Sequence, residues 1–172
     1  MNLLFYIAAF VAIIATLMAI VQLNPVHALL YLIVSLLSVA LIFFLLGAPF
    51  VAALEVIIYA GAIMVLFVFV VMMLNLGPQS EEEERRLMPR SAWPGPALLS
   101  AVLLAELIFA LAGGRHPAGL REIGPKEVGL ALFGPYLLGV ELASLLLLSG
   151  LIGAYHLGRQ DPPGGKRRED SK

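Results

Sequence analysis

The chain has 172 residues, 60% of them hydrophobic, with a formal net charge of −1 and a mean hydropathy of +0.95. Soluble domains are usually about 45–50% apolar, and one aqueous core of this length cannot hide the excess. The composition therefore predicts a protein whose main solvent is lipid. The charge balance excludes nucleic-acid binding, which needs concentrated Lys and Arg. The lack of cysteine excludes disulfides, thiolate metal sites and iron–sulfur ligation by this chain.

Five apolar segments are long enough, or nearly so, to cross about 30 Å of hydrocarbon as helices. We therefore expect an all-α, polytopic membrane protein whose membrane domain occupies residues 1–158. The expected helices cover residues 3–23, 26–46, 51–76, 94–112 and 135–157, and most of them end at Pro or Gly. Very short turns join the first three helices, which makes these helices antiparallel neighbours.

Basic residues near the ends of the segments predict the orientation. One side carries eight of them: Arg85, Arg86, Arg90, Arg159, Lys166, Arg167, Arg168 and Lys172. The other side carries three, Arg115, Arg121 and Lys126. The positive-inside tendency then puts the N-terminus outside and the C-terminus in the cytoplasm. Residues 159–172, rich in Pro, Gly and charge, are expected to form a disordered cytoplasmic tail, with docking as the alternative.

Three acidic residues, Glu55, Glu106 and Glu141, lie inside the predicted segments, which contain no Lys or Arg. An ionisable residue in a membrane helix is costly and by default suggests function. Because desolvation disfavours the charged form, such a carboxyl is suited to take up and release a proton. All three lie in the expected outer half of the membrane, roughly 6–9 Å from the helix ends. The alternative for each is a carboxylate that reaches toward interfacial water.

The third segment has an internal pattern. At α-helical spacing, Ala52, Glu55, Tyr59 and Ala62 share one face, and Tyr59 could hydrogen-bond Glu55 or hold a water molecule. Gly61 permits either close helix packing or a local rewinding such as a π-bulge. Both interpretations of Gly61 stay open on the spacing alone.

Other patterns indicate packing rather than ligand contacts. Small or hydroxyl side chains recur at spacings of three and four, which suits close helix packing in lipid. These stripes are Ala8, Ala12, Ala15 and Ala19; Ala28, Tyr31, Ser35 and Ser38; and the pairs Ser149/Gly153 and Ala154/Gly158. His27 is interpreted as an interfacial hydrogen-bonding group rather than a metal ligand. The sequence has no phosphate-binding glycine loop, nucleophile elbow or His pair, so we expect no catalytic centre and no cofactor or metal bound by this chain.

Two stretches, Asn24–Leu32 (NPVHALLYL) and Leu54–Asn75 (LEVIIYAGAIMVLFVFVVMMLN), resemble the subunit J (mitochondrial chain 6) family of proton-pumping NADH–quinone oxidoreductase, respiratory complex I. The resemblance covers about Leu3–Gly77 well. It implies a membrane-arm core subunit without a redox centre, in the cell inner (plasma) membrane. Flavin, iron–sulfur clusters, NADH and quinone would belong to partner subunits. The implied partners resemble mitochondrial chains 4L and 3 and an antiporter-like subunit.

The resemblance also implies a moving part in the third helix. In the family a π-bulge, here Tyr59–Val65, is thought to become regular helix during turnover and so to gate a proton or water path. The implied gate comprises Tyr59, Ala60, Gly61, Ala62, Ile63, Met64, Val65 and Phe67. Glu55 occupies the family's membrane glutamate position, which puts Glu55 and Tyr59 on the hypothetical proton path. Losing the bulge would rotate one helix end by about 100°, moving Phe67 or Met64 across the path. The alternative function is a small subunit of a multi-subunit cation/proton antiporter.

Overall fold

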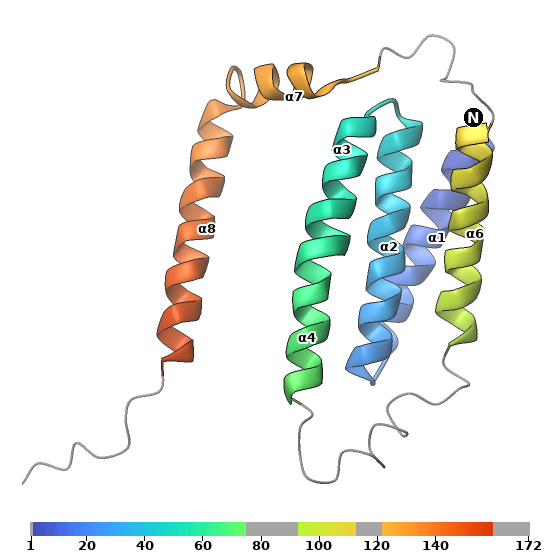
Figure 1. Ribbon diagram of the computed structural model, residues 1–172, viewed down its shortest axis with the longest axis horizontal. Coiled ribbons are helices and arrows are strands. Elements are labelled where there is room, and N and C mark those ends of the chain that lie inside the picture. Colours follow the sequence, from blue (N-terminus) through green and yellow to red (C-terminus); the bar gives the residue numbers. More distant parts are fainter. Residues whose placement is uncertain (1, 75–92, 113–121, 160–172) are drawn as a thin grey trace, which may run out of the picture. The chain divides into compact units, whose positions relative to one another are not determined.

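A computed structural model of the chain describes residues 2–74, 93–112 and 122–159, and that part is helical almost throughout. In chain order the elements are α1 (Asn2–Val21), α2 (Pro25–Leu45), α3 (Pro49–Leu54), the π-helix η1 (Glu55–Ile63), α4 (Met64–Leu74), α6 (Pro94–Ala112), α7 (Pro125–Leu132) and α8 (Leu137–Gly158) (Figure 1). Within these ranges, five helical segments, counting α3, η1 and α4 as one, are long and apolar enough to cross a membrane. The prediction of an all-α protein with five membrane helices is confirmed.

Proline marks where helices begin. Pro25, Pro49, Pro94 and Pro125 are the first residues of α2, α3, α6 and α7. The first helical position suits proline, because its missing N–H would have no partner inside the helix. At α2 the side-chain oxygen of Asn24 also accepts a hydrogen bond of 2.9 Å from the Val26 N–H. The second and third helices therefore begin one or two residues earlier than the sequence pattern predicted.

The turn after α2 depends on a glycine. Gly47 has a φ of 85°, in the left-handed region that favours glycine. The Ala48 N–H donates to the Phe43 carbonyl at 3.0 Å, and the Gly47 N–H donates to the Phe44 carbonyl at 3.1 Å. This pair of bonds is a Schellman motif, and Pro49 then starts α3. The compact turn makes α2 and α3 antiparallel neighbours, as predicted.

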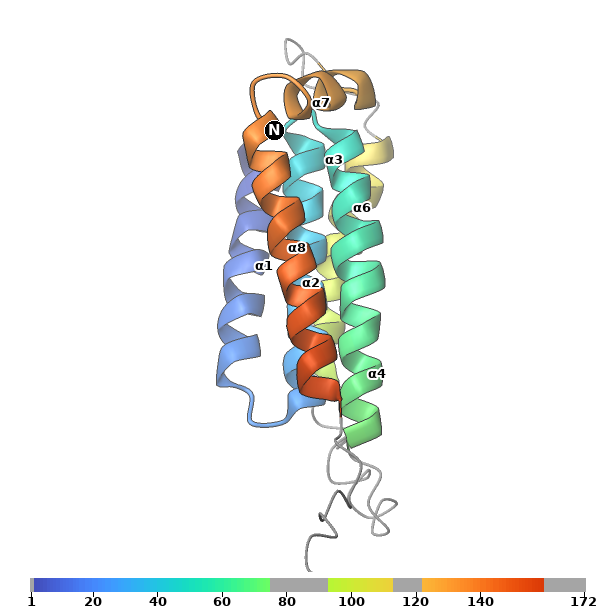
Figure 2. The same cartoon turned by 90° about the vertical axis from the view of Figure 1, so that its left-hand side faces the viewer.

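The chain up to Pro125 forms one unit, built around α2. In it α2 packs against α1, against the third membrane span and against α6, and α6 also packs against α1. Figures 1 and 2 show these helices side by side, with successive spans running in opposite directions. The buried apolar core comes from α1, α2 and α6, and its members are Ala8, Val11, Ala15, Val34, Leu41 and Leu103.

Polar contacts accompany the small residues between α1 and α2. The hydroxyls of Thr16 and Ser35 lie 2.7 Å apart, and the Ser35 hydroxyl also donates to the Ala12 carbonyl at 3.4 Å. One turn along, the fully buried Ser38 donates to the Ala8 carbonyl at 2.5 Å. Small residues on α1 thus expose carbonyl oxygens that α2 hydroxyls can reach. The interpretation of these two stripes as packing surfaces is confirmed.

Residues from Lys126 onward form a second unit, which is described here by itself. It contains most of α7, a helix that the sequence pattern did not predict, and α8. After α7 the chain turns through Tyr136, whose N–H donates to the Ala131 carbonyl at 3.1 Å. Three segments used in the sequence predictions lie outside the described residues: 75–92, 113–121 and 160–172. They hold most of the basic residues and the tail, so the orientation stays a prediction.

Candidate functional site

The third membrane span is α-helical only at its two ends. Between α3 and α4, the nine residues Glu55–Ile63 form a π-helix. At the start of this segment the Glu55 N–H bonds the carbonyls of Val51 and Ala52. At its end the Met64 N–H bonds the Tyr59 carbonyl, five residues back, together with that of Gly61. Figure 1 shows α3, η1 and α4 as one continuous helical rod. The hydrogen-bond register therefore changes without a break in the helix.

The π-helix covers the Tyr-Ala-Gly-Ala sequence, with bounds that differ from the family expectation of Tyr59–Val65. It begins at Glu55 and ends at Ile63. Of the expected gate residues, those from Tyr59 to Ile63 are π-helical, whereas Met64, Val65 and Phe67 belong to α4. Glu55, which the sequence placed before the bulge, is instead the first residue of the π-helix.

Gly61 leaves little room for a side chain against the backbone of its own helix. A Cβ atom at this position would lie 3.0 Å from the carbonyl oxygen of Val56, five residues earlier, and would meet no other residue within 4 Å. Since the close atom belongs to the backbone, it cannot move aside without changing the helix. The structure thus supports the rewinding interpretation of Gly61 over tight packing on a neighbouring helix. The sequence did not single out Val56, because α-helical spacing looks four residues back rather than five.

The exposure of the third span corrects the α-helical spacing argument. Ala52 and Met64 are buried, with exposed fractions of 7% and 2%, and α2 packs against this span. Glu55 is half-buried, Tyr59 is 49% exposed and Ala62 is exposed. The prediction that Ala62 shares a face with buried Ala52 is wrong, because each π turn holds more residues than an α turn.

The two polar residues of the hypothetical proton path, Glu55 and Tyr59, both lie in the π-helix. No hydrogen bond joins their side chains, both of which are described. Of the two residues expected to move, Met64 is buried, whereas Phe67 is 50% exposed. The structure therefore brings Glu55, Tyr59 and Gly61 together in one irregular segment, with Met64 at its junction with α4.

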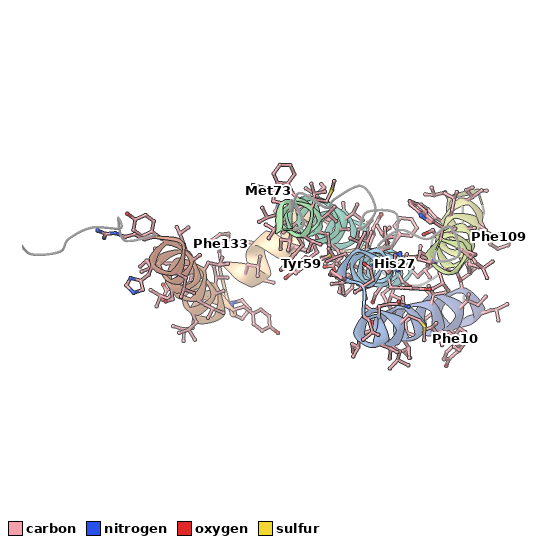
Figure 3. The ribbon with its side chains drawn as sticks, turned by 90° about the horizontal axis from the view of Figure 1, so that it is seen from below. Phe10, His27, Tyr59, Met73, Phe109 and Phe133 are labelled. Atoms are coloured by element: carbon pink, nitrogen blue, oxygen red, sulfur yellow. The ribbon has the colours of Figure 1, made fainter. Side chains whose placement is uncertain are left out.

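The other acidic residues of the membrane helices differ sharply in environment. Glu141 is exposed in its unit, whereas Glu106 is only 6% exposed. Both Glu106 oxygens are buried and lack a hydrogen-bond partner among the described residues. His27 is likewise buried, at 7% exposure, and its Nε2 has no partner in that part of the chain. Figure 3 shows His27 inside the group of helices and Phe109 on its outer surface.

Comparison with known proteins extends the similarity beyond the two motifs. The family model for NADH-ubiquinone/plastoquinone oxidoreductase chain 6 matches residues 15–157. NADH-quinone oxidoreductase subunit J of Pseudomonas aeruginosa is 60% identical over 163 residues, which cover 94% of this chain and 98% of the relative. The Escherichia coli protein of that name is 53% identical over 176 residues, which cover 99% of this chain and 95% of the relative. Subunit J of Buchnera aphidicola subsp. Schizaphis graminum is 50% identical over 161 residues, which cover 93% of this chain and 99% of the relative.

Proposed function

The chain belongs to the NADH-ubiquinone/plastoquinone oxidoreductase chain 6 family, and on that premise we propose that it couples quinone reduction to proton translocation in the membrane arm of an NADH–quinone oxidoreductase. In this proposal η1 (Glu55–Ile63) switches between π-helical and α-helical hydrogen bonding and thereby gates a proton or water path. The subunit J names of the relatives favour this function over the antiporter alternative. The five apolar spans fit a multi-pass protein of the cell inner membrane.

The observation that carries the proposal is the nine-residue π-helix in the middle of a membrane span. In globular proteins fewer than about 1% of residues are in π-helices. Those π-helical turns occur frequently at functional sites. A helix that changes register without losing its ends is a two-state element of the kind that couples distant sites. At Gly61 a side chain would be crowded in the π register, since its Cβ would lie 3.0 Å from the Val56 carbonyl oxygen.

The burial of Met64 indicates what a register change would do. Loss of the π register would rotate α4 relative to α3 by about 100°, the angle of one helical residue. Met64, now 2% exposed, would leave its place, and a neighbour such as Ile63 or Val65 would replace it. Glu55 and Tyr59 would move relative to α4 at the same time. The buried side of the third span would thus exchange an unbranched side chain for a β-branched one.

The redox chemistry belongs, in this proposal, to partner subunits that hold flavin, iron–sulfur clusters, NADH and quinone. The chain itself contributes the gate, with Glu55 and Tyr59 as the protonatable and hydroxyl groups beside it. Its expected neighbours are subunits like mitochondrial chains 4L and 3 and an antiporter-like subunit. The exposed apolar side chains of η1 and α4, such as Ile57, Val65 and Phe69, provide surface for such neighbours and for lipid.

The test is Gly61→Val in the assembled complex, reconstituted in liposomes. The added side chain crowds the Val56 carbonyl, at 3.0 Å from its Cβ, and disfavours the π register by about 1–3 kcal/mol. Such a bias shifts the ratio of the two registers about 5–150-fold. We expect coupled turnover and proton pumping to fall several-fold while the complex still assembles, with Gly61→Ala intermediate.

The matched control is Gly150→Val in α8, where a Cβ would meet nothing within 4 Å. It changes the same residue type in another membrane helix and should leave pumping unchanged. A Gly61→Val complex that assembles and pumps at the wild-type rate would show that the π register has no part in coupling.

A further inference from the structure

Among the described residues, Glu106 is the only acidic residue whose side chain is buried. It lies on α6, three residues after Leu103, and residues three apart share a helix face. Leu103 belongs to the core that α6 forms with α1 and α2. Glu106 therefore faces this three-helix core rather than the lipid. Its two carboxyl oxygens are buried and have no hydrogen-bond partner in the described chain.

The depth of Glu106 distinguishes it from a carboxylate at the membrane surface. It lies roughly 9 Å before Ala112, the last residue of α6. A side chain that extended from there toward water would be exposed, whereas Glu106 is 6% exposed. The structure thus excludes the interpretation that Glu106 reaches toward interfacial water.

No opposite charge lies on the helices around it. Residues 1–54, which include α1 and α2, contain no Asp, Glu, Lys or Arg, and Glu106 is the only charged residue of α6. The titratable groups of these helices are Tyr6, His27 and Tyr31. Tyr6 is 66% exposed and so points away from the core. Tyr31 lies against Gly95, roughly 16 Å along α6 from Glu106, and His27 is one turn farther along α2.

The energetics decide between the two forms of this carboxyl. An unpaired buried carboxylate carries a large desolvation cost, which here no opposite charge or hydrogen bond among the described residues offsets. A neutral carboxylic acid carries only the much smaller cost of a buried polar group. A leucine in the same place would carry neither cost, so packing does not require an acid. What Glu106 adds to this core is the capacity to hold a proton.

We infer that Glu106 is a proton-binding site separate from the π-helix: a neutral carboxylic acid enclosed by α1, α2 and α6, whose proton exchanges with water at the Ala112 end of α6. Exchange takes place at that end because it is roughly 9 Å away, against roughly 18 Å to Pro94 at the other. The path toward Pro94 also passes Leu103, of the apolar core, and Leu99, which packs against that core.

The test is infrared difference spectroscopy on the purified complex in lipid, comparing wild type with Glu106→Gln at neutral pH. We expect the variant to lose one carbonyl stretching band of a protonated carboxylic acid, and the same wild-type band to shift to lower frequency in D2O. Glu106→Asp should restore an acid band at a changed frequency. The control Glu122→Gln, exposed and outside the spans, should leave the acid band in place.

Three results would overturn the inference. The first is an acid band of unchanged intensity in Glu106→Gln, and the second is a wild-type band that does not respond to D2O. The third is failure of Glu106→Gln or Glu106→Leu to assemble, since a neutral acid without partners tolerates neutral replacements. The readout is independent of the coupling proposal, because Gly61→Val should lower pumping and leave this band unchanged.

Discussion

The contact between α2 and α6 makes a sharp prediction about Gly95, the second residue of α6. A Cβ atom on Gly95 would lie 2.1 Å from the hydroxyl oxygen of Tyr31 and 3.1 Å from its Cζ. Tyr31 is 9% exposed, so its ring has little freedom to retreat. Gly95→Ala therefore forces the two helices apart or displaces the ring. Overpacking of this kind costs typically about 1–3 kcal/mol.

A double-mutant cycle isolates the contact. Tyr31→Phe removes the closest atom and leaves Cζ at 3.1 Å, which a shift of a few tenths of an ångström relieves. We therefore expect Tyr31→Phe to recover most of the stability that Gly95→Ala loses, with an interaction energy of about 1–2 kcal/mol. The assay is thermal dissociation of the purified complex for wild type, both single variants and the double variant. Gly139→Ala is the control, since a Cβ there would meet nothing within 4 Å.

The reasoning would be refuted if Gly95→Ala dissociated at the wild-type temperature, or if its loss were the same with Tyr31 and with Phe at that position. Either result would mean that the Tyr31 hydroxyl does not lie against the first turn of α6.

Three further substitutions follow from the geometry. Gly47→Ala places a side chain at a φ of 85° and should cost about 1–2 kcal/mol, measured by thermal dissociation; full stability would mean that the turn after α2 has another conformation. Ser38→Ala removes the hydrogen bond to the Ala8 carbonyl and should cost about 0.5–1.5 kcal/mol in the same assay, whereas no loss would argue that this bond contributes nothing. In the proposed function neighbouring subunits supply alternative carboxylates, so Glu55→Gln should lower the proton-per-electron ratio less than Gly61→Val does. An unchanged ratio at full rate would make Glu55 structural.

The local sequence pattern was sufficient to predict features that depend on one helix alone, such as where a membrane span lies and where it begins. Lipid leaves an apolar segment of about 20 residues no alternative to a helix, because every backbone N–H and C=O must find a partner within the segment. The five spans and the starts at Pro25, Pro49 and Pro94 were therefore readable, or nearly so, from the sequence. The small stripe of α1 and the hydroxyls of α2 were likewise recognisable as packing surfaces, because small faces suit close helix contact in lipid. That these two surfaces meet each other is a finding of the structure.

The third span shows where local pattern ends. On spacing alone Gly61 fitted either close packing or an irregular backbone, and only the family resemblance indicated a π-bulge. The bounds Glu55–Ile63 could not be delimited from α-helical spacing, because the π register changes which residues share a face. Ala62 was misplaced for that reason.

Glu106 shows the other limit. Its depth followed from the position along the helix, but its burial depends on the rotation of α6 against α1 and α2. A hydropathy value depends only on residue type, so it cannot distinguish a carboxylate that faces lipid from one that faces water or the protein core. The sequence alone determined that an acidic side chain enters the membrane at this depth. Only the packing of three helices decided that it is enclosed without a partner, because side-chain direction around a helix axis is set by the neighbours that the helix contacts.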